Sequence, residues 1–292
     1  AGRRPDHITS LFMRTVAIIG VGLIGGSFAL ALRKAGFDGT ILGVSSRKTL
    51  DKALKLGAID EPSALSDAAR RADLLYLAQP IRAILETITS LEGCLKPGTL
   101  VTDAGSTKRE IVEAATTIRS AQFLGGHPMA GKEVRGVAAA DAALFAGRTY
   151  VLTPRQPDEM DTGAVREFRL WLERIGSQVL VLSPEEHDRV VAFTSHLPQL
   201  ASTALASLLA GTLHSSEETL VAGPGLQDAT RLALSDYEIW SDILQTNTGN
   251  IRAALRDYID RLQQLEESLN SDAAAAHFRT AAAFARLLRT RR

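Results

Sequence analysis

The sequence predicts an α/β fold in which a doubly wound, parallel-sheet domain is followed by an all-helical C-terminal domain. Two observations support this prediction. Up to residue 182 of 292, short apolar segments alternate with segments of helical periodicity. After residue 182 the helical periodicity continues, and we find no further strand pattern. We therefore expect one domain at residues 1–182 and a second at residues 183–292.

The expected strands of the first domain are short and apolar, and most are followed by an expected helix. The strands are expected at Thr15–Ile19, Thr40–Val44, Leu74–Leu77, Leu100–Thr102, Gln122–Leu124, Thr149–Leu152 and Gln178–Leu182. The helices are expected at Ser27–Ala35, Lys48–Leu56, Ile81–Leu91, Lys108–Thr117 and Asp158–Ile175. Because strands and helices alternate at this spacing, we expect parallel strands with helices on both faces.

The second domain begins with a strong helix-start signal at residues 183–186. Ser183 is an N-cap residue, Pro184 suits the first turn, and Glu186 completes a capping box. Further helical segments are expected at residues 187–212, 217–221, 228–234, 239–268 and 273–289. Roughly 110 residues of mostly apolar helix exceed the needs of a small cap, so we expect a helical dimerisation domain and a homodimer.

Composition and charge exclude several classes of partner. Lys plus Arg and Asp plus Glu both total 33, so the net charge is zero and we expect neither nucleic acid nor a membrane surface as a partner. The apolar run 190–213 is long enough to span a bilayer, but it contains Ser195, His196, Pro198 and Gln199 and is interpreted as a buried helix.

The single cysteine, Cys94, rules out an internal disulfide and fits a reducing, cytoplasmic location. Without CxxC or HExxH we expect no metal site. Residues 1–13 lack the apolar core of a signal peptide.

The expected strand at Val16–Ile19 runs directly into Gly20-Val21-Gly22-Leu23-Ile24-Gly25, which matches Gly-x-Gly-x-x-Gly and opens a helix. Gly20 permits a tight turn, Gly22 lets a pyrophosphate approach the backbone, and Gly25 lets the helix pack close to the strand. This order predicts a Rossmann dinucleotide-binding unit, in which Leu23 and Ile24 also contact the cofactor. A Gly-rich connection without a ligand is the alternative.

The loop after the second strand bears on the choice of cofactor. NAD-binding members of this fold carry an acid there for the ribose 2′-hydroxyl, whereas this chain has Ser45, Ser46 and Arg47. Small hydroxyls and cations suit a 2′-phosphate, so we expect NADP to be preferred, with NAD as a second choice. The alternative is a basic loop that faces water. Gln79 and Pro80, after the strand at 74–77, are expected to line the cofactor groove.

Two further loops carry candidate catalytic residues. Thr107 and Glu110 predict a capping box that starts a helix at Lys108, so Ser106 lies just ahead of it, within reach of a nicotinamide or a substrate. A Ser that only satisfies local backbone is an equally open interpretation. His127 lies in a Gly/Pro-rich loop after the strand at 122–124. Although an isolated His is more often structural, its place beside the cofactor site favours a catalytic base.

Several motifs together resemble one enzyme family. The chain carries GVGLIGGS, DAGSTK, GGHPMAG-x-E-x-x-G, LF-x-G, SHLPQ and a late D-x-x-R with a downstream Trp. This set is similar to the prephenate/arogenate (cyclohexadienyl) dehydrogenases of tyrosine biosynthesis, from about Arg14 to the C-terminal helices. The resemblance implies oxidative decarboxylation of prephenate to 4-hydroxyphenylpyruvate, or of arogenate to tyrosine, with hydride transfer to NADP or NAD.

The resemblance also implies roles for individual residues. His127 would accept the proton of the substrate 4-hydroxyl, and Ser106 would orient His127, hydroxyl and nicotinamide. Arg231 would hold the ring carboxylate, while Asp228 and Glu133 would pair with Arg231 in the empty site. Lys132 is also assigned to substrate binding. Without the resemblance, Asp228 and Arg231 would be read as an ordinary surface pair.

His196 and Gln199 would lie against the substrate side chain. Some prephenate-preferring members have a second His where this chain has Gln199, so the choice between prephenate and arogenate stays open. Tyrosine is expected to be a competitive inhibitor at the substrate site. From the length we expect neither the fused mutase nor the regulatory domain that family members often carry.

Two alternative functions fit the sequence less well. A β-hydroxyacid-type dehydrogenase would use a Lys on a second-domain helix, but residues 183–251 contain no Lys. A non-catalytic dinucleotide-sensing module would not need His127, Ser106 and Arg231 together.

Overall fold

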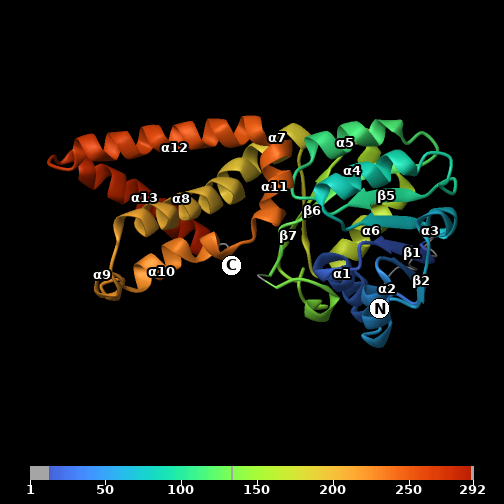
Figure 1. Ribbon diagram of the computed structural model, residues 1–292. Helices are drawn as coiled ribbons and strands as arrows, with labels where there is room; N and C mark the ends of the chain where they lie inside the picture. Colours follow the sequence, from blue (N-terminus) through green and yellow to red (C-terminus); the bar gives the residue numbers. More distant parts are fainter. Residues whose placement is uncertain (1–12, 133, 291–292) are drawn as a thin grey trace, which may run out of the picture. The chain divides into compact units, whose positions relative to one another are not determined.

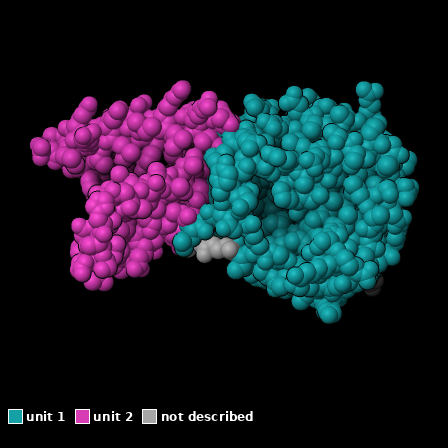
Figure 2. Space-filling view, in the orientation of Figure 1, with its two compact units in different colours: residues 1–191, 234–247 teal, residues 192–233, 248–292 magenta. Residues whose placement is uncertain are grey.

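A computed structural model describes residues 13–132 and 134–290, which form two compact units. The first unit comprises residues up to Val191 together with residues 234–247, and the second comprises residues 192–233 and 248–292 (Figure 2). The chain thus leaves the first unit after Val191 and returns to it for one further helix.

The first unit is built on an eight-stranded sheet with the order β3-β2-β1-β4-β5-β6-β7-β8 (Figure 1). The strands are β1 (Thr15–Ile19), β2 (Thr40–Val44), β3 (Glu61–Pro62), β4 (Leu74–Leu77), β5 (Leu100–Asp103), β6 (Gln122–Pro128), β7 (Thr149–Thr153) and β8 (Gln178–Val181). Order 3-2-1-4-5 is that of a Rossmann fold, so the predicted fold class is confirmed. The central strand β4 is fully buried, as its run of four apolar residues requires.

Helices cover both faces of this sheet. They are α1 (Leu23–Lys34), α2 (Arg47–Lys55), α3 (Leu65–Arg71), α4 (Ile81–Ser90), α5 (Arg109–Ala114) and α6 (Gly163–Arg174). Two further helices of this unit pack at its side: α7 (Pro184–Val191) contacts α5 and β7, and α11 (Tyr237–Thr246) contacts α4. In Figure 1, α4 and α5 lie on one face and α1 and α2 on the other. On the α1 face, Phe28 stacks on Tyr76 at 4.0 Å between ring centroids and meets Phe168 of α6 edge-on at 6.3 Å. These aromatic contacts bind α1 and α6 to the sheet.

The expectation of a wholly parallel sheet is wrong at one place. Residues 122–124 of β6 pair in parallel with β5, but Gly125–Pro128 continue the strand and pair antiparallel with β7. The two glycines hide this continuation from a sequence pattern because they have no strand propensity. Their lack of Cβ is nonetheless required, since a Cβ on Gly125 would lie 2.2 Å from Thr153 Oγ1 and one on Gly126 would lie 2.6 Å from Asp103 O.

Several helix boundaries also differ from expectation. Helix α1 begins at Leu23 instead of Ser27, and the short elements β3 and α3 were not predicted. The helix expected over 187–212 consists of α7, a π-helical turn (Ala192–His196) and α8 (Leu197–Thr212). Pro198 explains the break, because it has no N–H for the preceding turn and its ring crowds that turn. The helix expected over 239–268 is likewise interrupted, at Asn247.

The second unit contains the π-helical turn, α8, α9 (Ser216–Leu220), α10 (Pro224–Thr230), α12 (Thr248–Ser268) and α13 (Ala273–Thr290). Buried side chains on α8 hold the segment after α10 in place. Gln199 Nε2 donates to Leu232 O at 2.8 Å, and Ala233 N donates to Ser202 Oγ at 3.2 Å. No helix within the described ranges is both long and apolar enough for a bilayer crossing.

Candidate active site

The glycine-rich turn after β1 has the geometry of a phosphate cradle. Gly20 has a φ of +92°, and a Cβ there would lie 2.6 Å from Ala78 O. A Cβ on Gly25 would lie 2.3 Å from Gly20 O, whereas Gly22 faces open space. Helix α1 starts directly after Gly22, without a side-chain cap or an acidic residue in its first turn. The space and the helix N-terminus fit the pyrophosphate of a dinucleotide.

Two pockets of about 440 Å³ each adjoin this turn, both formed wholly within the first unit. They share lining residues at 78–80 and at Gly136. Together they gather most of the sequence-predicted cofactor residues: Gly20, Gly22 and Ser45 line one pocket, Leu23, Ile24 and Ser106 line the other, and Gln79 and Pro80 line both. This edge of the sheet is where a doubly wound fold binds its ligand.

Three predicted cofactor residues do not line these pockets. Gly25 is buried behind the turn, where its role is close packing. Ser46 Oγ lies 3.0 Å from Thr49 Oγ1, and Arg47 forms an exposed ion pair with Asp51 at 3.1 Å. Of the residues after β2 that were expected at a 2′-phosphate, only Ser45 faces the pocket.

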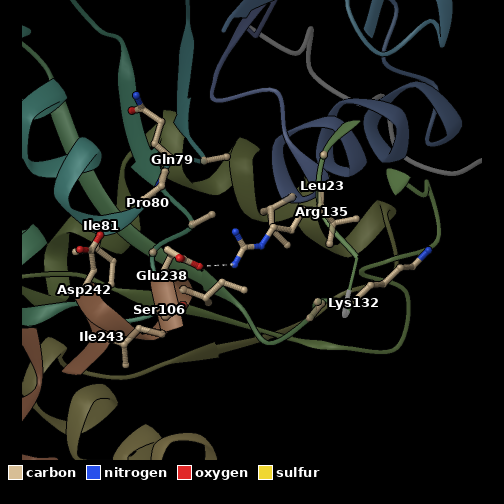
Figure 3. A pocket seen from close by; sticks show the side chains of 18 of the residues that line it. Leu23, Gln79, Pro80, Ile81, Ser106, Lys132, Arg135, Glu238, Asp242 and Ile243 are labelled. Carbon is tan, nitrogen blue, oxygen red and sulfur yellow. Dashed lines mark ion pairs between the residues drawn. The ribbon is translucent and has the colours of Figure 1, made fainter. Parts of the chain in front are cut away.

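A loop and a late helix supply the wall of the Ser106 pocket that sequence reasoning missed. Arg135 Nη2 lies 2.8 Å from Asp236 Oδ2 and 3.8 Å from Glu238 Oε2, and Glu238 and Asp242 of α11 line the pocket (Figure 3). Arg135 occupies an unspecified position of GGHPMAG-x-E-x-x-G and the three acidic residues belong to no motif, so no sequence signal singled them out. Lys132, a predicted substrate residue, also lines the pocket and pairs with Asp141 at 2.9 Å.

Ser106 precedes α5 as expected, but the capping box predicted for that helix is wrong. The Thr107 hydroxyl bonds to Thr246 Oγ1 of α11 at 2.7 Å, and α5 begins at Arg109. The carboxylate of Asp188 on α7 caps the helix instead, accepting from Lys108 N at 2.7 Å and Arg109 N at 3.0 Å. A distant residue has replaced the local cap, which no sequence window shows.

His127 is part of strand β6, opposite Val151 of β7, and not of a loop. Its side chain is buried, with 9% of its surface exposed, and is not among the groups lining the two pockets. Its Nδ1 lies 2.8 Å from Nε2 of His187, a residue to which the sequence assigned no role. Backbone pairing on one side and this contact on the other fix the position of the imidazole.

A fully buried ion pair joins the loop of Ser106 to the strand of His127. Lys108 Nζ donates to Asp103 Oδ2 and, at 2.7 Å, to Gly126 O. Asp103 also accepts from Gly105 N at 2.7 Å and Gly126 N at 3.1 Å. The residues flanking both candidate catalytic side chains are therefore bonded to one carboxylate.

The remaining predicted substrate residues belong to the second unit, except for Glu133, which lies outside the described residues. His196 is buried at the end of the π-helical turn. Arg231 directly follows α10, whose exposed Asp228 is three residues earlier. The amide nitrogen of Gln199 bonds within the unit, to Leu232 O and to Thr203 Oγ1. In the described parts of the chain, no cluster of three or more His, Cys, Asp or Glu side chains is arranged to hold a metal ion.

Comparison with known families decides the identity. Residues 28–181 match the nucleotide-binding domain of prephenate dehydrogenase, and residues 183–283 match its dimerization domain. The chain belongs to the prephenate dehydrogenase family. The predicted family is thereby confirmed, and its first domain is a nucleotide-binding domain.

Similar proteins from this family include a prephenate dehydrogenase of Lactococcus lactis, 38% identical over 80% of this chain and 65% of its own length. The chain thus spans about two thirds of that relative. A solved prephenate dehydrogenase from Aquifex aeolicus, in complex with hydroxyphenyl propionate and NAD+, is 33% identical, with a TM-score of 0.84 over 97% of this chain and 99% of that one. A Synechocystis arogenate dehydrogenase is 32% identical, with a TM-score of 0.75 over 94% and 96%. The family thus includes proteins named for either substrate.

Proposed function

We propose that this chain catalyses the oxidative decarboxylation of prephenate, of arogenate, or of both, with a nicotinamide dinucleotide as hydride acceptor. The observation that carries the proposal is the link between Ser106, which lines the pocket beside the glycine-rich turn, and the strand that holds His127. Family membership supports the same reaction.

In this proposal the chemistry that a bound nicotinamide supplies is acceptance of the hydride that leaves C4 of the substrate ring. His127 accepts the proton of the 4-hydroxyl, while Ser106 orients that hydroxyl by a hydrogen bond. Loss of CO2 then makes the ring aromatic. His127 must be neutral to act, so turnover falls at acidic pH.

The experiment that tests the proposal uses the purified protein with each of the two substrates and each of NAD+ and NADP+. The absorbance of reduced nicotinamide reports turnover, and released CO2 reports decarboxylation. Equal amounts of both products are expected with at least one substrate. If neither reduced nicotinamide nor CO2 formed with any combination of substrate and cofactor, the proposal would be contradicted.

NADP is the proposed preferred cofactor, because Ser45 faces the pocket at the end of β2 and no acid stands at positions 45–47. We predict that Ser45→Asp lowers the kcat/KM ratio of NADP to NAD by about tenfold or more, since a carboxylate repels a 2′-phosphate and accepts from a 2′-hydroxyl. Ser46→Asp is the matched control, because Ser46 does not line the pocket itself, although its hydroxyl lies 3.0 Å from that of Thr49, which does. Equal effects of the two variants would contradict the assignment of Ser45.

Arg231 is proposed to hold the ring carboxylate, with His196, Gln199, Asp228, Glu133 and Lys132 as further substrate residues. We predict that Arg231→Ala raises KM for the substrate by about 10²-fold, the loss of one charge-assisted pair, and leaves KM for the cofactor within about twofold. The KM of Arg231→Lys for the substrate should fall between that of the native protein and that of Arg231→Ala. If both KM values rose together, the variant would have damaged the fold, and the carboxylate role would lose its support.

A homodimer through the second unit is proposed on two grounds. Residues 183–283 match a dimerization domain, and several large apolar side chains of the second unit are exposed, among them Leu208 (65%), Phe278 (71%) and Phe284 (61%).

Tyrosine is proposed as a competitive inhibitor that uses the same Arg231 contact, so Arg231→Ala should also weaken inhibition by tyrosine.

A further inference from the structure

A hydrogen-bonded chain of three buried side chains begins at the proposed base, His127. His127 Nδ1 lies 2.8 Å from His187 Nε2, and His187 Nδ1 lies 2.8 Å from Asp188 Oδ1. His187 has no exposed surface, and Asp188 is 2% exposed. The mechanism above uses neither His187 nor Asp188.

The direction of each hydrogen bond follows from the fixed donors around Asp188. The backbone amides of Lys108 and Arg109 can only donate, so both oxygens of the Asp188 carboxylate are acceptors. His187 Nδ1 must then carry the proton that it shares with Asp188. The side chain of Asn247 donates to the backbone carbonyl of Asp188 at 2.8 Å and holds this residue from the other side.

The setting of His187 favours its neutral form. Burial lowers the pKa of His187 below its ordinary value, although hydrogen bonding and charge from Asp188 oppose the shift. Lys108 lowers the same pKa, whereas Asp103 raises it, and the charge of Asp188 in turn raises the pKa of Glu110 on α5. A neutral ring with its proton on Nδ1 has a lone pair on Nε2.

We propose that His187, oriented by Asp188, is a positioning residue that fixes the tautomer of His127. Because His187 Nε2 can only accept, His127 must donate from Nδ1, which leaves the lone pair on its Nε2 to receive the substrate proton. The bond also favours the charged ring that forms when His127 takes up that proton. This inference rests on the proposed role of His127 as the base.

Two substitutions of His187 distinguish the role of its Nε2 acceptor from that of the rest of its side chain. His187→Gln keeps a carbonyl oxygen near the position of Nε2, whereas His187→Asn keeps only a donor near the position of Nδ1. We expect His187→Asn to lower kcat by about 10- to 100-fold, less than removal of the base itself, and His187→Gln to recover most of that loss. His214→Asn, an exposed histidine of the second unit, is the control and should leave kcat unchanged.

Two readouts report the tautomer and not merely the fold. In 15N-histidine spectra, His127 of the native chain should be protonated on Nδ1, and His187→Asn should move that proton to Nε2. The acidic limb of the kcat/KM profile should also move to lower pH in His187→Asn, because the charged ring has lost an acceptor. The spectrum of His127→Asn identifies the signal among the six histidines.

The outcomes are distinguishable. If His127→Asn keeps full turnover, the proposed function fails together with its base. If His127→Asn is inactive but His187→Asn matches the His214→Asn control, the positioning role is overturned. Should His187→Asn fail to fold, the native spectrum still decides, since a proton on His127 Nε2 would overturn the inference.

Discussion

Replacing His127 by Asn is expected to lower kcat by about 10²- to 10⁴-fold, the usual contribution of a positioned general base. Asn keeps a donor close to the position of Nδ1, so the contact with His187 Nε2 and the pairing of β6 with β7 are retained. Turnover is measured from reduced nicotinamide at saturating substrate and cofactor. Cofactor affinity, measured by titration in the absence of substrate, should stay within about threefold.

Ser106→Ala is the companion to this variant, because Ser106 lines the pocket and does not take the proton. Its effect should be smaller than that of His127→Asn. Turnover of His127→Asn within a few-fold of the native protein would show that the proton goes elsewhere.

Replacing Lys108 by Met is expected to destabilise the fold by about 3–5 kcal/mol, because it leaves the carboxylate of Asp103 buried without its countercharge. Neither side chain has any exposed surface. Burial lowers the pKa of Lys108, and the charge of Asp103 acts against that shift. The free energy of unfolding is measured by denaturant titration.

Two controls separate the buried pair from a general effect of losing a lysine. Lys96→Met removes a partly exposed pair with Asp73 and should cost less than about 1 kcal/mol. The double variant Asp103→Asn with Lys108→Met should be more stable than Lys108→Met alone, because no unpaired charge remains. A double variant as unstable as the sum of its two single changes would show that the pair is not coupled.

Sequence reasoning predicted those parts of the fold whose signals are local. The run Val16–Ile19 is apolar enough to be a central strand, and Ser183 caps α7 as expected, accepting from Glu186 N at 3.1 Å. The predictions were wrong where a contact between residues far apart in the chain determines the local structure. Gly125 and Gly126 form a strand because β7 pairs with them, and Thr107 bonds to Thr246 instead of capping α5.

The same distinction holds for the candidate site. Gly20, Gly22 and Ser106 were found because their spacing from strand ends is regular, and all three line the pockets. His187 and Asp188 were missed because adjacent histidine and aspartate residues within a helix have no motif value. Their importance arises only when α7 packs beside α5 and β6.

Helix α11 makes the first unit discontinuous in the sequence. The segment 234–247 follows the whole first stretch of the second unit, residues 192–233, yet it contributes Glu238, Asp242 and Ile243 to the pocket wall. A gene fragment that stops after the last strand would encode the glycine-rich turn but not this wall. A separately expressed cofactor-binding unit would therefore need α11 joined to residues 1–191. Recombination between relatives should likewise exchange residues 1–191 and 234–247 together.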